Sequence, residues 1–242
     1  RADVALLEDA GRTVGPRSRL RLHLGTSEVG ARVVALDGAL APGESRAARV
    51  VVEEPIVTRT GDRFVLRGGS PFGTVGGGIV TDPLAPRRAR ALSLASDDRI
   101  ASLDQFLVEA GVAGVDLAEL PVRLGVGRSK LDAVLDASER WRAGDRLYSA
   151  AARETIAQLL LDALGSHHRD NPLSSGTPRQ WLRSRVRAPD AAVEAITELL
   201  VRDGRIVADG GEVRLADFAP RLSERQQALA ASVSARIAAA GV

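Results

Sequence analysis

Residues 53–83 read EEPIVTRTGDRFVLRGGSPFGTVGGGIVTDP, and this stretch decides the predicted fold. Phe64 and Leu66 are predicted to face one way while Val65 and Arg67 face the other, which is the period-two pattern of a strand with one buried face. After a Gly-Gly break, residues 74–80 predict a second strand. Its run of glycines permits a bend, a bulge or the close approach of another backbone. The stretch therefore predicts the wall of a small closed β-barrel.

Strand signals continue upstream of this stretch. Short apolar runs separated by turn residues are typical of all-β barrels. Such runs lie near residue 1 and over residues 19–24, 29–36 and 45–52, with turn residues at 37–38 and 42–43. We therefore predict a six-stranded-type closed antiparallel β-barrel.

Beyond residue 97 the apolar period changes from two to 3.6 residues, which indicates amphipathic helices. Three short helices followed by a hairpin describe a winged helix, and this order occurs twice. Residues 209–211, Asp-Gly-Gly, form the predicted turn of the second hairpin. The predicted domains are the barrel at 1–84, a linker at 85–97, tandem winged helices at 98–150 and 151–219, and the start of a truncated third winged helix at 220–242.

Three segments carry a family resemblance. Within residues 63–78, an Arg-Phe pair, a Gly-Gly turn and a Thr-Val-Gly-x-Gly strand resemble the last two strands of the third domain of translation elongation factor Tu. Residues 21–57 are similar to the version of that domain in the bacterial selenocysteine-specific elongation factor. HRDNPLSSGTPRQWLRSRV, residues 168–186, resembles the connection between the first two helices of that factor's second winged helix.

The resemblance implies a fragment of a GTP-dependent factor that delivers selenocysteinyl-tRNA to the ribosome at recoded UGA codons. GTP, Mg²⁺ and GTP hydrolysis would belong to a missing amino-terminal domain, so this fragment is expected to be no enzyme and to hold no cofactor. A missing carboxyl-terminal winged helix would hold the messenger-RNA hairpin. The expected state is a cytoplasmic monomer with no membrane contact.

The resemblance also implies which barrel residues contact tRNA. Carried over from elongation factor Tu, the contacts fall on Arg21, Gly30, Arg67, Gly68 and Gly69. His23, on the same strand as Arg21, either reaches RNA or lies on the barrel surface. Elongation factor Tu commonly has threonine where Gly30 stands and glutamate where Gly68 stands. Backbone groups and Arg67 would therefore carry the contact here.

Basic residues near the third helices of the winged helices are candidates for RNA phosphate contacts, because a helix start adds free amides to a cation. They are Arg123, Arg128 and Lys130 in the first module, and Arg179, Arg183 and Arg185 in the second. Acidic residues follow on both third helices and would repel a nucleic-acid groove. A spacer arm is therefore the favoured role of these modules, and a winged-helix DNA-binding transcription regulator with a β-barrel domain is the alternative function.

Composition excludes several kinds of site. The chain has no cysteine, so it has no disulfide and no thiolate ligand or nucleophile. It has no run of apolar residues long enough to span a bilayer. His167 and His168 are adjacent and point apart on a helix, so they are not predicted to bind one metal ion. They are predicted to interact with the negative end of the helix dipole instead. Glu53 and Glu54 are predicted on opposite faces of a strand, which argues against an acid/base pair.

Overall fold

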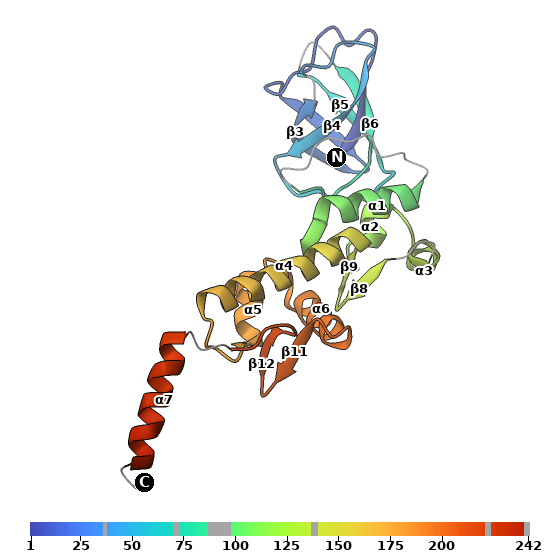
Figure 1. Cartoon of the computed structure of the whole chain (residues 1–242). Coiled ribbons are helices and arrows are strands. Elements are labelled where there is room, and N and C mark those ends of the chain that lie inside the picture. Colours follow the sequence, from blue (N-terminus) through green and yellow to red (C-terminus); the bar gives the residue numbers. More distant parts are fainter. Residues whose placement is uncertain (36–37, 70–72, 87–97, 137–139, 221–223, 240–242) are drawn as a thin grey trace. The chain divides into compact units, whose positions relative to one another are not determined.

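The first six strands of the computed structural model close into an antiparallel barrel, which confirms the predicted fold (Figure 1). The order around the barrel is β1-β4-β3-β2-β5-β6, and β1 pairs with both β4 and β6 to close the ring. The strands are β1 (Ala2–Leu6), β2 (Leu20–Leu24), β3 (Ser27–Ala35), β4 (Ser45–Val52), β5 (Arg63–Arg67) and β6 (Thr74–Val80).

The structure describes residues 1–35, 38–69, 73–86, 98–136, 140–220 and 224–239. Most of the predicted linker and part of the predicted 37–38 turn lie outside these ranges. The chain divides into two units. Unit 1 contains 1–110, 115–140 and 145–147, and unit 2 contains 111–114, 141–144 and 148–242.

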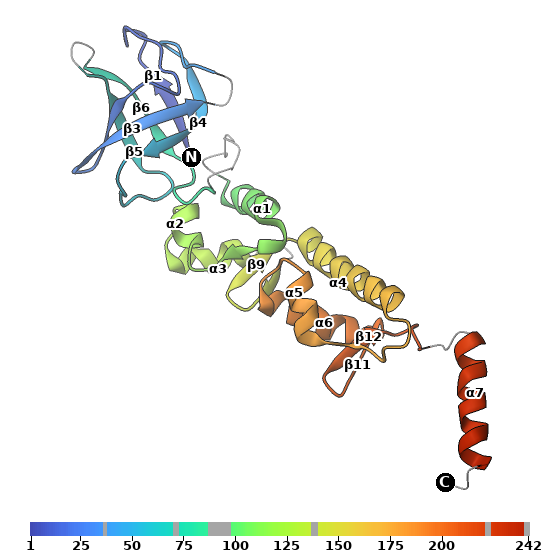
Figure 2. The ribbon, with the colours of Figure 1, turned by 90° about the vertical axis from the view of Figure 1, so that its left-hand side faces the viewer.

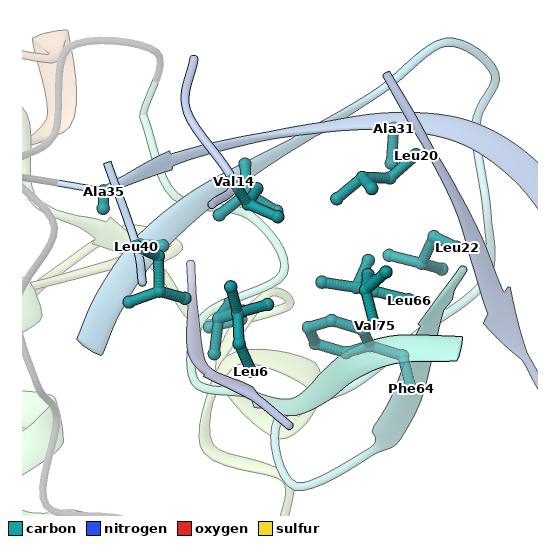
Figure 3. Packing of buried hydrophobic residues seen from close by; sticks show 14 of the residues in the cluster. Leu6, Val14, Leu20, Leu22, Ala31, Ala35, Leu40, Phe64, Leu66 and Val75 are labelled. Atoms are coloured by element: carbon teal, nitrogen blue, oxygen red, sulfur yellow. The ribbon is translucent and has the colours of Figure 1, made fainter. Parts of the chain in front are cut away.

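The barrel interior contains Phe64 and Leu66, which the sequence pattern predicts on one face, together with apolar residues of the other strands. Leu22, Phe64, Leu66 and Val75 are at most 4% exposed. Figure 3 shows these side chains converging inside the barrel. Burial of this apolar surface stabilises the barrel and leaves the intervening residues on its outer face.

The glycines of β6 let neighbouring backbones approach closely. A Cβ atom at Gly76 or Gly78 would collide with carbonyl oxygens of β1, and one at Gly77 would collide with the carbonyl of Phe64. The pairing of β5 with β6 also shifts between Leu66 and Arg67, as at a β-bulge. Of the three alternatives that the glycine run permits, close approach is present at Gly76, Gly77 and Gly78, and the register shift lies just beside them.

The first winged helix follows in the predicted order of helices and hairpin. Its buried apolar cluster includes Leu103, Phe106, Leu107 and Leu120. Strand β9 pairs with β7 through Val115 and Leu147. The elements are α1 (Arg99–Ala110), a 3₁₀ turn (Gly111–Ala113), β7 (Val115–Asp116), α2 (Leu120–Leu124), α3 (Arg128–Asp136), β8 (Trp141–Ala143) and β9 (Arg146–Tyr148).

Buried polar contacts join the barrel to the first winged helix within unit 1. Asp82, just beyond β6, is fully buried and accepts hydrogen bonds of 3.1 and 2.8 Å from Nε and Nη2 of Arg123 in α2. The Thr60 hydroxyl donates to the Arg123 carbonyl, and Nη2 of Arg1 donates to both carboxylate oxygens of Glu109 at 2.8 Å. These two domains are therefore held together by direct contacts as well as by the chain between them.

Unit 2 carries the second winged helix, whose apolar core forms around Ile156, Leu160 and Ile196. Figure 2 shows α4, α5 and α6 with the β11–β12 hairpin beside them. The elements are α4 (Ala150–Asp170), β10 (Thr177–Pro178), α5 (Arg179–Arg185), α6 (Asp190–Arg202), β11 (Ile206–Asp209), β12 (Glu212–Leu215) and α7 (Glu224–Ala239). None of the described helices has the length and apolar character needed to cross a membrane.

His168 holds the hairpin of unit 2 to the end of α4. Its Nε2 accepts a 3.1 Å hydrogen bond from the backbone N–H of Leu215, and its ring stacks on Phe218 with centroids 3.7 Å apart. Burial, followed by the neighbouring charge of His167, lowers the pKa of His168. A neutral ring is required here because Nε2 must accept a hydrogen bond.

Candidate nucleic-acid interface

Three of the predicted tRNA-contact residues lie side by side on adjacent strands. Arg21 of β2 pairs directly with Gly30 of β3 on one side and with Arg67 of β5 on the other. Directly paired residues point to the same face of a sheet, and both arginines are exposed. We call Gly30, Arg21 and Arg67 the arginine row. The register thus brings together residues that are 46 positions apart in sequence, from 21 to 67.

His23 lies in the next outward-facing row, between Glu28 of β3 and Val65 of β5. Its Nδ1 is 3.8 Å from one carboxylate oxygen of Glu28, and Nε of Arg21 is 3.8 Å from the other. Glu28 therefore bridges the two rows and offsets part of their positive charge. The structure places His23 on the half-exposed outer surface, where both alternatives for its role remain open.

Glu53 covers one end of the arginine row, a contact that no sequence pattern predicts. Its backbone N–H donates to the Gly30 carbonyl at 2.9 Å, and its side chain fills the space that a Cβ at Gly30 would occupy. Glu53 and Glu54 follow the last residue of β4, so their predicted placement within a strand is wrong. Only the register between β3 and β4 reveals this neighbour of Gly30.

Gly68 and Gly69 begin the turn that follows Arg67. The Gly68 N–H donates a 2.7 Å hydrogen bond to the Gly73 carbonyl, which closes the turn next to the arginine row. Gly69 is exposed, and no atom would contact a Cβ placed there. The backbone of Gly69 is therefore accessible to solvent.

Arg123 differs from its predicted role as an RNA phosphate contact. It is 6% exposed, its guanidinium is bonded to Asp82, and its Cζ lies 4.2 Å from the ring centre of Phe106. A buried arginine with these partners cannot reach a phosphate without breaking the junction. Arg128 and Lys130, in contrast, are exposed in the first turn of α3.

The three arginines of α5 are divided between two partners. Glu194 of α6 accepts hydrogen bonds from Arg179, at 2.7 Å, and from Arg183. The hydrogen bond from Arg183, and then that from Arg179, lowers the pKa of Glu194, while the same contact raises the pKa of Arg183. Arg185 is exposed instead and lies over the ring of Trp181, with Cζ 5.0 Å from its centre. Arg179 and Arg183 are thus partly neutralised.

Two family models match the chain. Residues 2–87 match the selenocysteine-specific elongation factor β-barrel domain, and residues 161–215 match the winged helix of elongation factor SelB. This chain carries two domains of the selenocysteine-specific elongation factors. The resemblance inferred from the barrel motifs is confirmed, and the second match falls on the module predicted at residues 151–219.

Known relatives cover both units of the chain. The selenocysteine-specific elongation factor of Desulfomicrobium baculatum is 28% identical over 231 residues, which are 88% of this chain and 36% of the relative. That of Escherichia coli (strain K12) is 28% identical over 219 residues, 87% of this chain and 34% of the relative. The chain thus spans about a third of the length of these relatives.

A solved structure shares the fold. The crystal structure of bacterial selenocysteine-specific elongation factor EF-Sec superimposes with a TM-score of 0.61 at 15% identity, covering 88% of this chain and 34% of that one. At this identity the match concerns the fold alone, which is the barrel with winged helices described above.

Proposed function

We propose that this chain is the tRNA-contacting barrel and part of the winged-helix arm of a factor that delivers selenocysteinyl-tRNA to the ribosome at recoded UGA codons. In this proposal GTP and Mg²⁺ bind a domain outside the chain, and a further winged helix binds the messenger-RNA hairpin. The chain itself contributes binding and mechanical coupling. The arginine row is the single observation that carries the proposal.

The chemistry of the arginine row suits duplex RNA. The groove of an A-form helix that proteins can reach displays phosphates and 2′-hydroxyls. Arg21 and Arg67 are exposed neighbours that can each contact a phosphate, and the Gly68–Gly69 turn offers backbone next to them. Glu28 and Glu53 oppose this charge, so a moderate affinity is expected, which suits a factor that must release its tRNA.

The junction between the barrel and the first winged helix gives the proposal its mechanical part. The buried Asp82–Arg123 pair and the Thr60 hydrogen bond join the two domains inside unit 1. A force on the tRNA-holding barrel is therefore passed directly to α2. A flexible tether alone would transmit less of it.

Filter binding with the 242-residue chain tests the proposal. We expect tighter binding to selenocysteine tRNA than to duplex DNA, and about tenfold weaker tRNA binding for Arg67→Ala, since one charged contact is worth about 1–2 kcal/mol. Arg63→Ala is the matched control, because Arg63 is exposed on the same strand about 13 Å away. Equal binding of tRNA by both variants, or a preference for DNA, would overturn the proposal.

The DNA-binding regulator remains the alternative function, and one contact argues against it. Reading DNA in the major groove requires a basic recognition helix. On α6, Glu194 holds Arg179 and Arg183, and Asp190 lies in the first turn. This helix therefore presents carboxylates where DNA phosphates would approach.

A further inference from the structure

A small hollow in unit 2 has the chemistry of a nucleobase site. It lies between the end of α4 and the face of α5, with a volume of about 350 Å³. This is near the lower end of the range for ligand pockets, so it suits one planar group. The residues that line it are Ser166, His167, Asp170, Asn171, Trp181 and Arg185, together with an alanine.

The flat groups of the hollow are already arranged around Trp181. The His167 ring meets Trp181 edge-on, with centroids 5.0 Å apart, and the Arg185 guanidinium lies over the indole. Trp181 is only partly buried, so this face is not sealed by the core of unit 2. Unpaired RNA bases stack on aromatic rings and on guanidinium planes, and both surfaces are present here.

Polar groups around the rings can read the edge of a base. Asn171 donates through its amide to the His167 carbonyl at 3.1 Å and lies 3.4 Å from Nδ1 of His167. Nε2 of His167 is buried, so the polar groups that a base can reach here are those of Asn171 and Asp170, which are both exposed. Asp170 can accept a hydrogen bond from an exocyclic amine of a base.

Charge favours a nucleic acid as the source of the base. Arg179 and Arg183 are held by Glu194, whereas Arg185 makes no ion pair with any described carboxylate. Of the three arginines of α5, Arg185 is therefore the one whose guanidinium can contact a phosphate while it lies over the Trp181 ring. We propose that this hollow binds an unpaired nucleobase of single-stranded RNA. The site is separate from the arginine row and does not depend on tRNA binding there.

Fluorescence of Trp181 tests the site. The chain contains two tryptophans, so Trp141→Phe leaves Trp181 as the reporter. We expect a short single-stranded oligoadenylate to quench this fluorescence, and an RNA duplex of the same length to leave it unchanged. In the same background Arg185→Ala should weaken binding about tenfold, the size of one lost stacking contact.

Two control variants and a free nucleotide show whether the quenching arises from the proposed site. Arg153→Ala removes an exposed arginine near the start of α4 and should leave quenching unchanged, and so should Arg67→Ala in the barrel. AMP separates the two sources of a base, and equal affinity for AMP would assign the site to a free nucleotide and overturn the RNA proposal. Equal quenching by duplex, equal loss in Arg185→Ala and Arg153→Ala, or no quenching would overturn the base site altogether.

Discussion

Asp82 and Arg123 form a two-pronged ion pair that is buried between the barrel and the first winged helix. The Asp82 side chain is 0% exposed and that of Arg123 is 7% exposed, with the closer N–O distance at 2.8 Å. Arginine suits this position because its planar fork can bond both carboxylate oxygens. The pair therefore fixes the orientation of α2 relative to the end of β6.

Asp82→Asn should destabilise unit 1, because it removes the closer and buried counter-charge of Arg123 and leaves only Glu119, 3.8 Å away. The expected loss in the free energy of unfolding is about 3–5 kcal/mol. Denaturant unfolding followed by circular dichroism measures it. The double variant Asp82→Leu with Arg123→Met should recover most of the loss, since an apolar pair of similar volume replaces both charges. Failure of the double variant to recover would contradict this account.

Gly76→Ala and Gly30→Ala should differ sharply in stability. A methyl group at Gly76 meets the backbone carbonyl of Ala5, which cannot move without distorting β1, so a loss of about 1–3 kcal/mol is expected. At Gly30 the obstacle is the end of the Glu53 side chain, which can rotate away, so the loss should stay below about 1 kcal/mol. Thermal and denaturant unfolding compare the two variants, and equal losses would contradict this prediction.

Unit 2 should lose stability as the pH falls below the ordinary histidine range. The folded chain lowers the pKa of His168 from about 6.5, so the unfolded chain takes up the proton first. Stability is then complete above about pH 6.5 and falls on acidification by at most about 1.4 kcal/mol per pH unit from this group.

His168→Gln should remove this part of the pH dependence while keeping an acceptor for the Leu215 N–H. Denaturant midpoints between about pH 8 and about pH 5 measure the slope. His167→Gln is the control and should retain most of the slope, because burial lowers the pKa of His168 more than the neighbouring charge of His167 does. An unchanged slope in His168→Gln would show that another group titrates.

Glu53→Gln should strengthen RNA binding by the barrel about twofold to fivefold, because it removes a negative charge from the arginine row. Glu54→Gln is the matched control, since Glu54 is the exposed neighbour in sequence. Filter binding of selenocysteine tRNA at constant salt compares them. Equal effects of the two changes would mean that the carboxylate acts only through net charge.

Arg67→Ala should also reduce the salt dependence of tRNA binding. Each phosphate contact that is lost lowers the slope of log K against log salt by about one. Arg63→Ala should leave the slope unchanged. A weaker affinity with an unchanged slope would indicate that Arg67 acts through the shape of the turn rather than through a phosphate.

The regular parts of the fold could be predicted because local pattern dictates them. Alternation placed Phe64 and Leu66 inside the barrel, and the Asp-Gly-Gly sequence supplied the two positive φ angles of the second hairpin, 55° at Gly210 and 88° at Gly211. The ends of the domains at residues 84, 150 and 219 stay predictions.

The partners of charged residues could not be predicted in the same way. Asp82 is 41 positions from Arg123, and no periodicity links them. From the sequence, Arg123 is therefore predicted to contact a phosphate, because it is a basic residue near a helix start. In the structure its side chain forms a buried ion pair with Asp82. The same holds for Glu53, whose position over Gly30 depends on the β3–β4 register, and for Glu194, which holds Arg179 and Arg183.

Closure of the barrel also limits how other molecules can recognise it. Because β1 pairs with both β4 and β6, the ring formed by the described strands β1 to β6 leaves no unpaired edge. A peptide cannot attach by extending the sheet, and two barrels cannot join edge to edge. Recognition must instead use individual outward side chains and turn amides, so partner choice can change by single substitutions without altering the scaffold.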